Sequence, residues 1–414
     1  MYIHRACEKT IKKINETFPV LLVTGPRQVG KSTVLEHLAS NRTIVSLDDL
    51  NIRALAKQDP VLFFQRYRPP LLIDEIQYAP ELLPYIKMIV DKEKQNGMFW
   101  LTGSQAFHLM KNVSESLAGR VGIVELLGLS TNEINESKSE PYQSDPQVLI
   151  KRIQEKKKMT SVEIFERIFK GSMPRLYDNS NVDWEMYYSA YMNTYIQRDI
   201  RDLTQVADET QFMNFMCVVA ARTSRPVVYQ EIADDVGISL PTVKRWLSLL
   251  ISSHIVVLVQ PYHNNRLKRV VKMPLLHFLD TGLCAFLLKW SSPEILEKGA
   301  MAGQFFETYV FSEIYKSFLN EGKIPPIYYY RDKQKKEIDL LLAENGKVYP
   351  IEIKKSGTPG KKAIKNFDVL KPLEKEENKF SDLKVEVGYG SVICMIDDLL
   401  PIDEKNWYVP AWLI

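Results

Sequence analysis

A glycine-bearing segment near the N-terminus, Gly25-Pro-Arg-Gln-Val-Gly-Lys-Ser32, fits the pattern G-x-x-x-x-G-K-S. The apolar run Pro19–Thr24 comes directly before it and predicts a strand, and residues Thr33–Ser40 predict a helix. In this strand–loop–helix context the pattern forms a phosphate-binding loop, because glycines let the backbone approach phosphate and a helix N-terminus favours an anion. We therefore expect a nucleoside triphosphate to bind at this loop.

The residue types in the loop have expected roles in binding ATP with Mg²⁺. Lys31 is expected to reach the β- and γ-phosphates, and the Ser32 hydroxyl is expected to ligate Mg²⁺. The residues expected to contact the nucleotide are Gly25, Pro26, Arg27, Gln28, Val29, Gly30, Lys31, Ser32 and Thr33.

An acidic pair ends a second apolar run, Leu71-Leu-Ile-Asp-Glu75. After a phosphate-binding loop this pattern predicts that Asp74 holds Mg²⁺ and that Glu75 orients and polarises the attacking water. An acidic pair after a strand is otherwise a helix cap or a solvated turn. The acidic pair lies downstream of the loop, with a strand between, and this place favours its interpretation as part of a nucleotide-binding site.

Two further positions are expected to complete this site. The run Thr102-Gly-Ser-Gln105 ends the next predicted strand, and either Ser104 or Thr102 is expected to contact the γ-phosphate or the lytic water. The alternative is a polar strand end that caps the following helix. Arg120 is expected to stabilise charge on the γ-phosphate, in its own chain or in a neighbouring one, and the alternative is a surface salt bridge.

Short apolar runs alternate with helical patterns over the first 130 residues. This alternation predicts a parallel sheet with helices on both faces. The predicted strands are Pro19–Thr24, Thr43–Leu47, Pro70–Asp74, Met98–Thr102 and Val121–Leu127.

The chain resembles the AAA-type P-loop ATPases of prokaryotes that carry a C-terminal domain of unknown function. The resemblance rests first on Gly25–Ser32, Leu71–Glu75, Leu101–Ser104 and Ser116–Arg120, and then on Gly171–Leu176, Tyr195–Ile200, Phe278–Leu283 and Gly303–Glu307. It implies an α/β fold with four parts: an ATPase core over residues 1–130, a helical lid over 131–222, a winged helix over 223–275 and a restriction-endonuclease-like domain over 276–414.

The segment Tyr229–Leu250 reads as helix, turn and helix, with Ser239 as the expected cap of the second helix. Ile255–Val259 and Val270-Val271 are the expected strands of a wing whose tip is His263–Arg269. Either this unit binds DNA, or it packs between domains. In the first case the groove-facing residues would be Thr242, Lys244 and Arg245.

The spacing of Asp339, Glu352 and Lys354 resembles the PD-(D/E)XK nuclease motif, with Glu307 as the acid on the preceding helix. The acids are then expected to bind a second Mg²⁺ or Mn²⁺, and Lys354 to polarise the phosphate or the water. Ile338 stands where that motif usually has proline. The alternative is a solvated hairpin with an ordinary ion pair.

We therefore expect an ATPase that couples hydrolysis to conformational change acting on nucleic acid. The alternatives are an ATP-regulated nuclease and a scaffold whose nuclease-like domain binds protein partners. The net charge of +3 permits DNA or RNA binding without arguing for it, and the four cysteines lack zinc-finger spacing. Without a run of about 18 apolar residues we expect no membrane span, and the cysteine usage fits a cytoplasmic location. The sites of AAA-type ATPases often lie between subunits, which leaves a homo-oligomer open.

Overall fold

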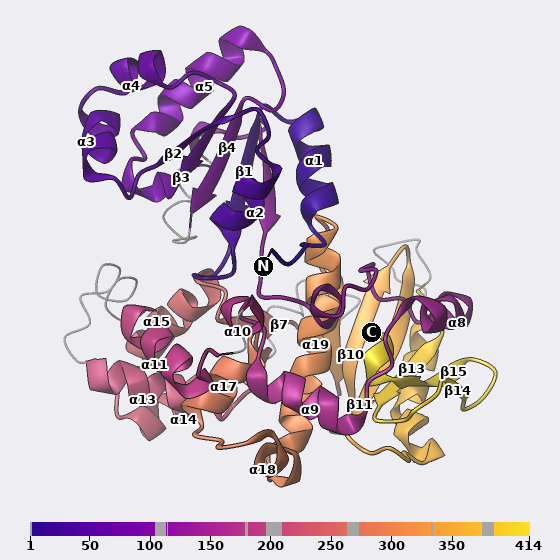
Figure 1. Ribbon diagram of the computed structural model, residues 1–414. Helices are drawn as coiled ribbons and strands as arrows, with labels where there is room; N and C mark the ends of the chain where they lie inside the picture. Colours follow the sequence, from indigo (N-terminus) through magenta and orange to yellow (C-terminus); the bar gives the residue numbers. More distant parts are fainter. Residues whose placement is uncertain are drawn as a thin grey trace.

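The computed structural model describes residues 2–103, 113, 115–178, 181–195, 209–262, 273–332, 334–374 and 385–414. Figure 1 shows an N-terminal α/β unit at the top and a larger body below it that holds the middle and C-terminal parts. The N-terminus lies between these two bodies (Figure 1).

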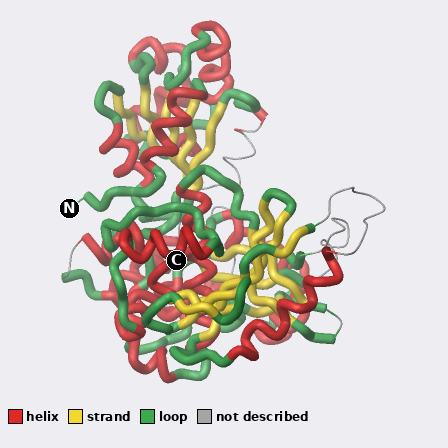
Figure 2. The backbone as a smooth tube through the Cα atoms, turned by 90° about the vertical axis from the view of Figure 1, so that its right-hand side faces the viewer, coloured by secondary structure: helices red, strands yellow, loops and turns green. Residues whose placement is uncertain are grey.

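The N-terminal unit is built on a five-stranded sheet in the order β2-β3-β4-β1-β5. Figure 2 shows its strands with helices on both sides. Its elements are α1 (Glu8–Thr17), β1 (Val20–Thr24), α2 (Lys31–Leu38), β2 (Thr43–Ser46), α3 (Leu50–Gln58), α4 (Pro60–Arg66), β3 (Leu71–Asp74), the short 3₁₀ helix η1 (Ile76–Tyr78), α5 (Leu82–Glu93), β4 (Phe99–Gly103) and β5 (Val121–Glu125).

All neighbouring strands of this sheet are parallel, as the sequence predicts. The central strands β1 and β4 are buried along their whole length, which explains their continuous apolar runs. The five strands lie where the apolar runs predict them, with ends that differ by one or two residues. Because the strands are parallel, their C-terminal ends share one edge of the sheet.

Helices dominate the middle of the chain. They are α7 (Thr131–Ile134), α8 (Pro146–Glu155), α9 (Ser161–Lys170), α10 (Arg175–Asp178), α11 (Trp184–Tyr195) and α13 (Glu209–Ala220). The predicted motif Tyr195–Ile200 lies almost entirely outside the described residues.

A helix-turn-helix, α14 (Tyr229–Val236) and α15 (Leu240–Ser252), follows these helices. It packs with a three-stranded sheet in the order β6-β8-β7, formed by β6 (Arg225–Pro226), β7 (Val256–Val259) and β8 (Leu275–Phe278). The predicted strand Val270-Val271 and the wing tip lie outside the described residues. Because β8 pairs with β7 up to Phe278, the predicted domain boundary after residue 275 falls inside a strand.

The C-terminal unit begins with a long helix and continues into a seven-stranded sheet, in the order β14-β15-β13-β11-β10-β9 with β12 paired to β11. Two short helices, α17 (Thr281–Leu287) and α18 (Pro293–Lys298), lead into it. Its elements are α19 (Ala302–Asn320), β9 (Ile327–Arg331), β10 (Glu337–Glu344), β11 (Lys347–Lys354), the 3₁₀ helix η3 (Lys361–Glu374), β12 (Glu386–Val387), β13 (Gly390–Cys394), β14 (Leu400–Pro401), β15 (Asn406–Pro410) and the 3₁₀ helix η4 (Ala411–Leu413).

Two motifs that carried the resemblance meet around Asp280. This carboxylate accepts hydrogen bonds from the backbone N–H and the hydroxyl of Ser172, at 2.7 and 2.6 Å, and from the Tyr188 hydroxyl at 2.7 Å. It also caps α17 through the N–H of Leu283 at 2.6 Å. A buried carboxylate with four donors is a stable packing element. The motif around Asp280 therefore has a structural explanation: it joins the middle helices to the start of α17.

Among the described residues, no helix combines the length and the apolar character needed to cross a membrane.

Candidate nucleotide site

The phosphate-binding loop connects the buried strand β1 to α2. Gly25 has a φ of +144°, and an added Cβ there would lie 1.9 Å from the carbonyl oxygen of Leu126. Gly30 has a φ of +89° and directly precedes α2. Glycine is thus required where the loop passes under the end of β5, and it is favoured where α2 begins.

Lys31, the first residue of α2, is 6% exposed. Its ammonium group donates hydrogen bonds to the carbonyl oxygens of Gly25 at 3.1 Å and Pro26 at 2.7 Å. The ammonium group therefore lies against the loop that is expected to surround the phosphates. Neutral carbonyls are weaker partners for an ammonium group than phosphate oxygens, so a bound triphosphate would compete for it.

The hydroxyl of Ser32 donates to Oδ1 of Asp74 at 2.6 Å, which joins the start of α2 to the end of β3. Both side chains present hard oxygen donors, the kind that Mg²⁺ prefers. The pair fits a Mg²⁺ held jointly by the protein and by phosphate oxygens.

Thr102 is the second hydroxyl at this carboxylate. In the strand order, β4 lies between β1 and β3, so its C-terminal end falls between the loop and the acidic pair. Thr102 donates to Oδ1 of Asp74 at 2.5 Å and accepts a hydrogen bond from the N–H of Glu75 at 3.0 Å. Of the two residues predicted for this position, Thr102 contacts the acidic pair, and Ser104 lies outside the described residues.

Glu75 follows β3 in a left-handed conformation, with φ +57° and ψ +48°. This conformation costs free energy for a residue other than glycine, and it ends the strand at the acidic pair. The side-chain amide of Gln77 donates to Oε2 of Glu75, which orients the carboxylate. A carboxylate fixed at this edge can accept a proton from a water or position that water.

Arg120 lies at the end of the sheet where the strands begin, opposite to the end that carries the phosphate-binding loop. Val121, which follows it, pairs with Val20 at the start of β1, whereas the loop follows Thr24 at the end of that strand. A strand of this length spans roughly 13 Å. Arg120 forms an ion pair with Asp91, with distances of 2.6 and 3.0 Å. The prediction that Arg120 stabilises the γ-phosphate in its own chain is therefore wrong.

A cavity of about 200 Å³ lies beside the phosphate-binding loop. Gln28, Gly30 and Thr33 line it from the loop and α2, while Tyr2 and Arg175 line it from the N-terminal segment and α10. The sequence patterns did not indicate this cavity, because its walls come from four separate parts of the chain.

The sequence patterns did not indicate a role for His254 either. It lies in the turn after α15 with a φ of +54°, and it shares a small cavity with Pro26 and Val29 of the loop. Burial lowers the pKa of His254, and the Lys31 ammonium adds to this shift while Glu125 opposes it. The turn after the helix-turn-helix unit thus lies close to the nucleotide loop.

The exposed face of the helix-turn-helix unit carries two of the three residues predicted to face DNA. Lys244 and Arg245 are exposed on α15, and Thr242 is half-buried near its start. The Ser239 hydroxyl accepts a hydrogen bond from the N–H of Thr242 at 3.3 Å, so Ser239 caps the helix as predicted.

The acidic residues predicted as a second metal site lie on α19, β10 and β11. Lys354 contacts two of them: its ammonium group is 2.6 Å from Oε1 of Glu352 and 3.6 Å from Oδ2 of Asp339. Oε2 of Glu352 is buried and has no hydrogen-bond partner. In the part of the chain that the structure describes, no three histidine, cysteine, aspartate or glutamate side chains form a group able to hold a metal ion.

The carboxyl groups in this cluster titrate above their ordinary range. Burial raises the pKa of Glu352 to about 7, and the Asp339 carboxylate adds to the shift while Lys354 opposes it. Burial and the Asp339 carboxylate also raise the pKa of Glu307. The cluster therefore favours protons or additional positive charge near neutral pH.

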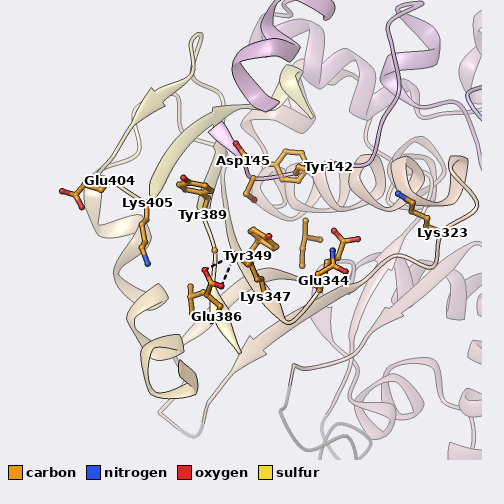
Figure 3. Close-up of a pocket in the computed structure, with 16 residues that line it drawn as sticks. Tyr142, Asp145, Lys323, Glu344, Lys347, Tyr349, Glu386, Tyr389, Glu404 and Lys405 are labelled. Atoms are coloured by element: carbon orange, nitrogen blue, oxygen red, sulfur yellow. Dashed lines mark hydrogen bonds and ion pairs between the residues drawn. The ribbon is translucent and has the colours of Figure 1, made fainter. Parts of the chain in front are cut away.

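A separate polar cavity of about 740 Å³ lies at the far end of the β10–β11 hairpin (Figure 3). Tyr349 and Tyr389 lie along it, and the ion pair between Lys347 and Glu386, at 3.0 Å, crosses its edge (Figure 3). Glu344 and Lys347, at this end, pair across the hairpin, while Asp339 and Glu352 lie toward its other end. The cavity and the acidic cluster are therefore distinct.

Models of three families match successive parts of the chain. The AAA domain matches residues 17–135, the domain of unknown function DUF8612 matches 162–294, and the domain of unknown function DUF4143 matches 302–414. Together with the parallel sheet and the loop, the first match supports a P-loop ATPase-like domain of the AAA type in the N-terminal unit. The second match spans the predicted boundaries after residues 222 and 275, and the third begins with α19.

The chain is similar to two uncharacterized mycobacterial proteins, Mb2031c of Mycobacterium bovis and Rv2008c of Mycobacterium tuberculosis. Each is 28% identical over 82% of this chain and 71% of the relative. Among solved structures, the Walker-type ATPase PABY2304 of Pyrococcus abyssi aligns with a TM-score of 0.44 and 14% identity, over 68% of this chain and 94% of the other. A DNA replication initiation factor aligns with a TM-score of 0.25 and 10% identity, over 58% and 85%.

Proposed function

We propose that this protein binds ATP with Mg²⁺ at the phosphate-binding loop, hydrolyses it, and couples hydrolysis to a conformational change that acts on nucleic acid. The ATPase assignment rests on one observation. The hydroxyls of Ser32 and Thr102 both donate to Oδ1 of Asp74, and Ser32 directly follows Lys31 in the chain. Three separate chain segments supply these groups, and a solvated turn does not require such convergence.

Each side chain has a distinct role in this proposal. Lys31 exchanges its carbonyl partners for phosphate oxygens. Ser32 and Asp74 hold Mg²⁺, which neutralises phosphate charge when bound. Glu75, oriented by Gln77, positions the attacking water, and Thr102 keeps the Asp74 carboxylate in place.

The cavity beside the loop is the proposed place for the nucleoside. Its volume of about 200 Å³ is suited to a base and part of the ribose. Tyr2 offers an aromatic ring and Arg175 offers a cation in the lining of this cavity.

ATP turnover tests this function, with Lys31→Ala as the diagnostic variant. We expect phosphate release to fall at least about a hundredfold, because the variant loses the charge that stabilises the γ-phosphate. Lys57→Ala, an exposed lysine in the last turn of α3, is the matched control. Equal turnover in Lys31→Ala and wild type would sink the assignment.

The helix-turn-helix unit and its three-stranded sheet are the proposed nucleic-acid contact, as a winged helix. The exposed cations Lys244 and Arg245 support this role. We expect double-stranded DNA to stimulate ATP turnover, and added salt to remove the effect, because phosphate contacts weaken with salt. The variant that replaces both cations by alanine should lose this stimulation while its turnover without DNA is unchanged.

A metal-dependent nuclease is the second candidate function. The buried, unpartnered Oε2 of Glu352, within a cluster that favours positive charge, supports it. Cleavage of DNA or RNA with Mg²⁺ or Mn²⁺ should be lost in both Asp339→Asn and Lys354→Met. Glu344→Gln, on the same hairpin, is the control.

Equal cleavage by these variants and wild type would identify a contaminating nuclease. A chain that neither binds nor cleaves nucleic acid at low salt would favour the third role, a C-terminal unit that binds protein partners.

A further inference from the structure

Arg5 lies buried between the phosphate-binding loop and the chain that leaves β5, and it is 6% exposed. Its guanidinium group donates to the carbonyl oxygen of Val29 at 2.7 Å and to that of Leu127 at 2.7 Å. Val29 directly precedes Gly30 and Lys31 in the loop. Arg5 therefore fixes the loop backbone relative to β5, next to the residue expected to bind phosphate.

Glu133 balances the buried charge of Arg5. Its Oε1 accepts from Nε of Arg5 at 3.0 Å and from the N–H of Ala6 at 2.8 Å. Its Oε2 accepts from the N–H of Ser130 at 2.7 Å and from the Ser130 hydroxyl at 3.0 Å, so Glu133 also belongs to the cap of α7. A buried charge pair in which each oxygen has two donors is a rigid element.

Hydrogen bonds from α7 connect this network to the C-terminal unit. The N–H of Thr131, in α7, donates to Oε2 of Glu313 at 2.7 Å, and the Thr131 hydroxyl is 2.8 Å from that of Tyr309. Glu313 accepts from Lys316 at 2.8 Å, and Lys316 donates to the carbonyl oxygen of Leu129 at 3.1 Å. All these contacts are buried, and Tyr309, Glu313 and Lys316 lie on α19.

The C-terminal end of α19 makes a second contact with the ATPase domain. The Thr10 hydroxyl of α1 donates to the carbonyl oxygen of Asn320, the last residue of α19, at 2.7 Å. Figure 1 shows α19 rising from the lower body to α1. The helix therefore contacts the ATPase domain at two places, one of which is linked by hydrogen bonds to the loop.

We propose that Arg5 is a positioning residue of the nucleotide site, and that Glu133, Thr131 and Glu313 extend its support to α19. Nucleotide binding at the loop and packing of α19 then stabilise each other. The inference rests on the proposed nucleotide binding and adds to it the dependence on α19. Because coupling between sites is reciprocal, a change at either end must be measurable at the other.

The first test compares two arginines that hold carbonyl groups in the ATPase domain. Arg5→Lys keeps the charge but loses the planar fork that holds two carbonyls at a fixed separation. Arg42→Lys is the matched control, because Arg42 donates to the carbonyl oxygens of Gly97 at 2.6 Å and Met98 at 3.3 Å, at the opposite edge of the sheet. Affinity for ADP with Mg²⁺ should fall about tenfold in Arg5→Lys and change less than about twofold in Arg42→Lys.

The second test starts from α19. Glu313→Gln should weaken ADP binding about threefold. The double variant with Arg5→Lys should bind no more weakly than Arg5→Lys alone, because both changes break the same connection. In the wild type, ADP should slow backbone hydrogen exchange in residues 302–320, and Glu313→Gln should remove most of this protection.

These outcomes separate the inference from the proposed function. Equal ADP affinity of Arg5→Lys and Arg42→Lys would overturn the positioning role, in a protein that still binds nucleotide. Additive losses in the double variant, or exchange in α19 that ADP does not change, would overturn the link to the C-terminal unit. A wild-type chain that binds no nucleotide would refute the proposed function, and this inference with it.

Discussion

The hydroxyl of Thr102 donates to Oδ1 of Asp74 at 2.5 Å, and the same oxygen accepts from Ser32 at 2.6 Å. One carboxylate oxygen thus joins the ends of two neighbouring strands to the start of α2. A carboxylate with two hydroxyl donors has a restricted orientation, which favours its role as a metal-holding group. Thr102 therefore restricts the orientation of the Asp74 carboxylate without itself having to touch a nucleotide.

Thr102→Val should reduce kcat about tenfold to a hundredfold while ATP affinity changes little. The substitution keeps the shape but removes a hydrogen bond to a charged group, a contact worth roughly 1.5–3 kcal/mol. Phosphate release at saturating ATP gives kcat, and calorimetry gives the affinity. Thr43→Val, on the exposed first position of β2, is the matched control. An unchanged kcat in Thr102→Val would show that Asp74 needs no such support.

Glu75→Gln should bind ATP with nearly wild-type affinity and hydrolyse it at least about a hundredfold more slowly. The amide keeps the size of the side chain but is a poor proton acceptor, and general-base catalysis contributes roughly 10²–10⁴ in rate. Single-turnover measurements separate this effect from product release. Glu93→Gln, at the exposed end of α5, should behave as wild type. Hydrolysis at the wild-type rate in Glu75→Gln would assign the water-orienting role to another group.

The strands of the ATPase domain could be predicted because buried parallel strands read as continuous apolar runs. The nucleotide loop could be predicted because its glycines and lysine lie within one short segment, Gly25–Ser32. The contact of Thr102 with Asp74 could not be predicted, because it depends on the position of β4 between β1 and β3. That order is a property of the folded sheet, and local patterns do not encode it.

Arg120 is a residue whose type suits the chemistry but which lies away from the loop of its own chain, and its role in a neighbouring chain stays a prediction. It comes just before β5, so strand direction puts it at the edge away from the loop. Sequence spacing does not report which end of a strand faces the site. Arg5 was missed for a related reason, because its partners Val29, Leu127 and Glu133 are distant in sequence and two of them are backbone carbonyls.

The buried pair between Arg5 and Glu133 should make stability depend on pH. Burial raises the pKa of Glu133, but the Arg5 guanidinium and the N–H groups of Ser130 and Ala6 outweigh it, so the net pKa lies below the ordinary 4.5. A carboxyl with a lowered pKa stabilises the fold above the ordinary value. This contribution is lost as pH falls from about 4.5 through the folded pKa.

Glu133→Gln should therefore destabilise the protein by roughly 3–5 kcal/mol at pH 7, because it leaves the Arg5 charge buried and unpaired. The difference from wild type should shrink as the pH falls below 4.5. Urea unfolding at several pH values measures both effects. Glu163→Gln is the matched control, since Glu163 forms the same kind of capping box with Thr160 on the surface. A pH-independent difference would mean that Glu133 is not ionised in the folded protein.

Gly25→Ala should abolish nucleotide binding and lower the melting temperature. The new Cβ would lie 1.9 Å from the carbonyl oxygen of Leu126, so the loop or the end of β5 must move. Either movement displaces the carbonyl groups around Lys31. Gly303→Ala is the control with open space around its Cβ, and on α19 the change should stabilise the protein by up to about 1 kcal/mol. Calorimetric titration with ADP and thermal melting distinguish the two. Wild-type affinity for ADP in Gly25→Ala would contradict this prediction, because it would show that the loop can move away from Leu126 without losing the nucleotide site.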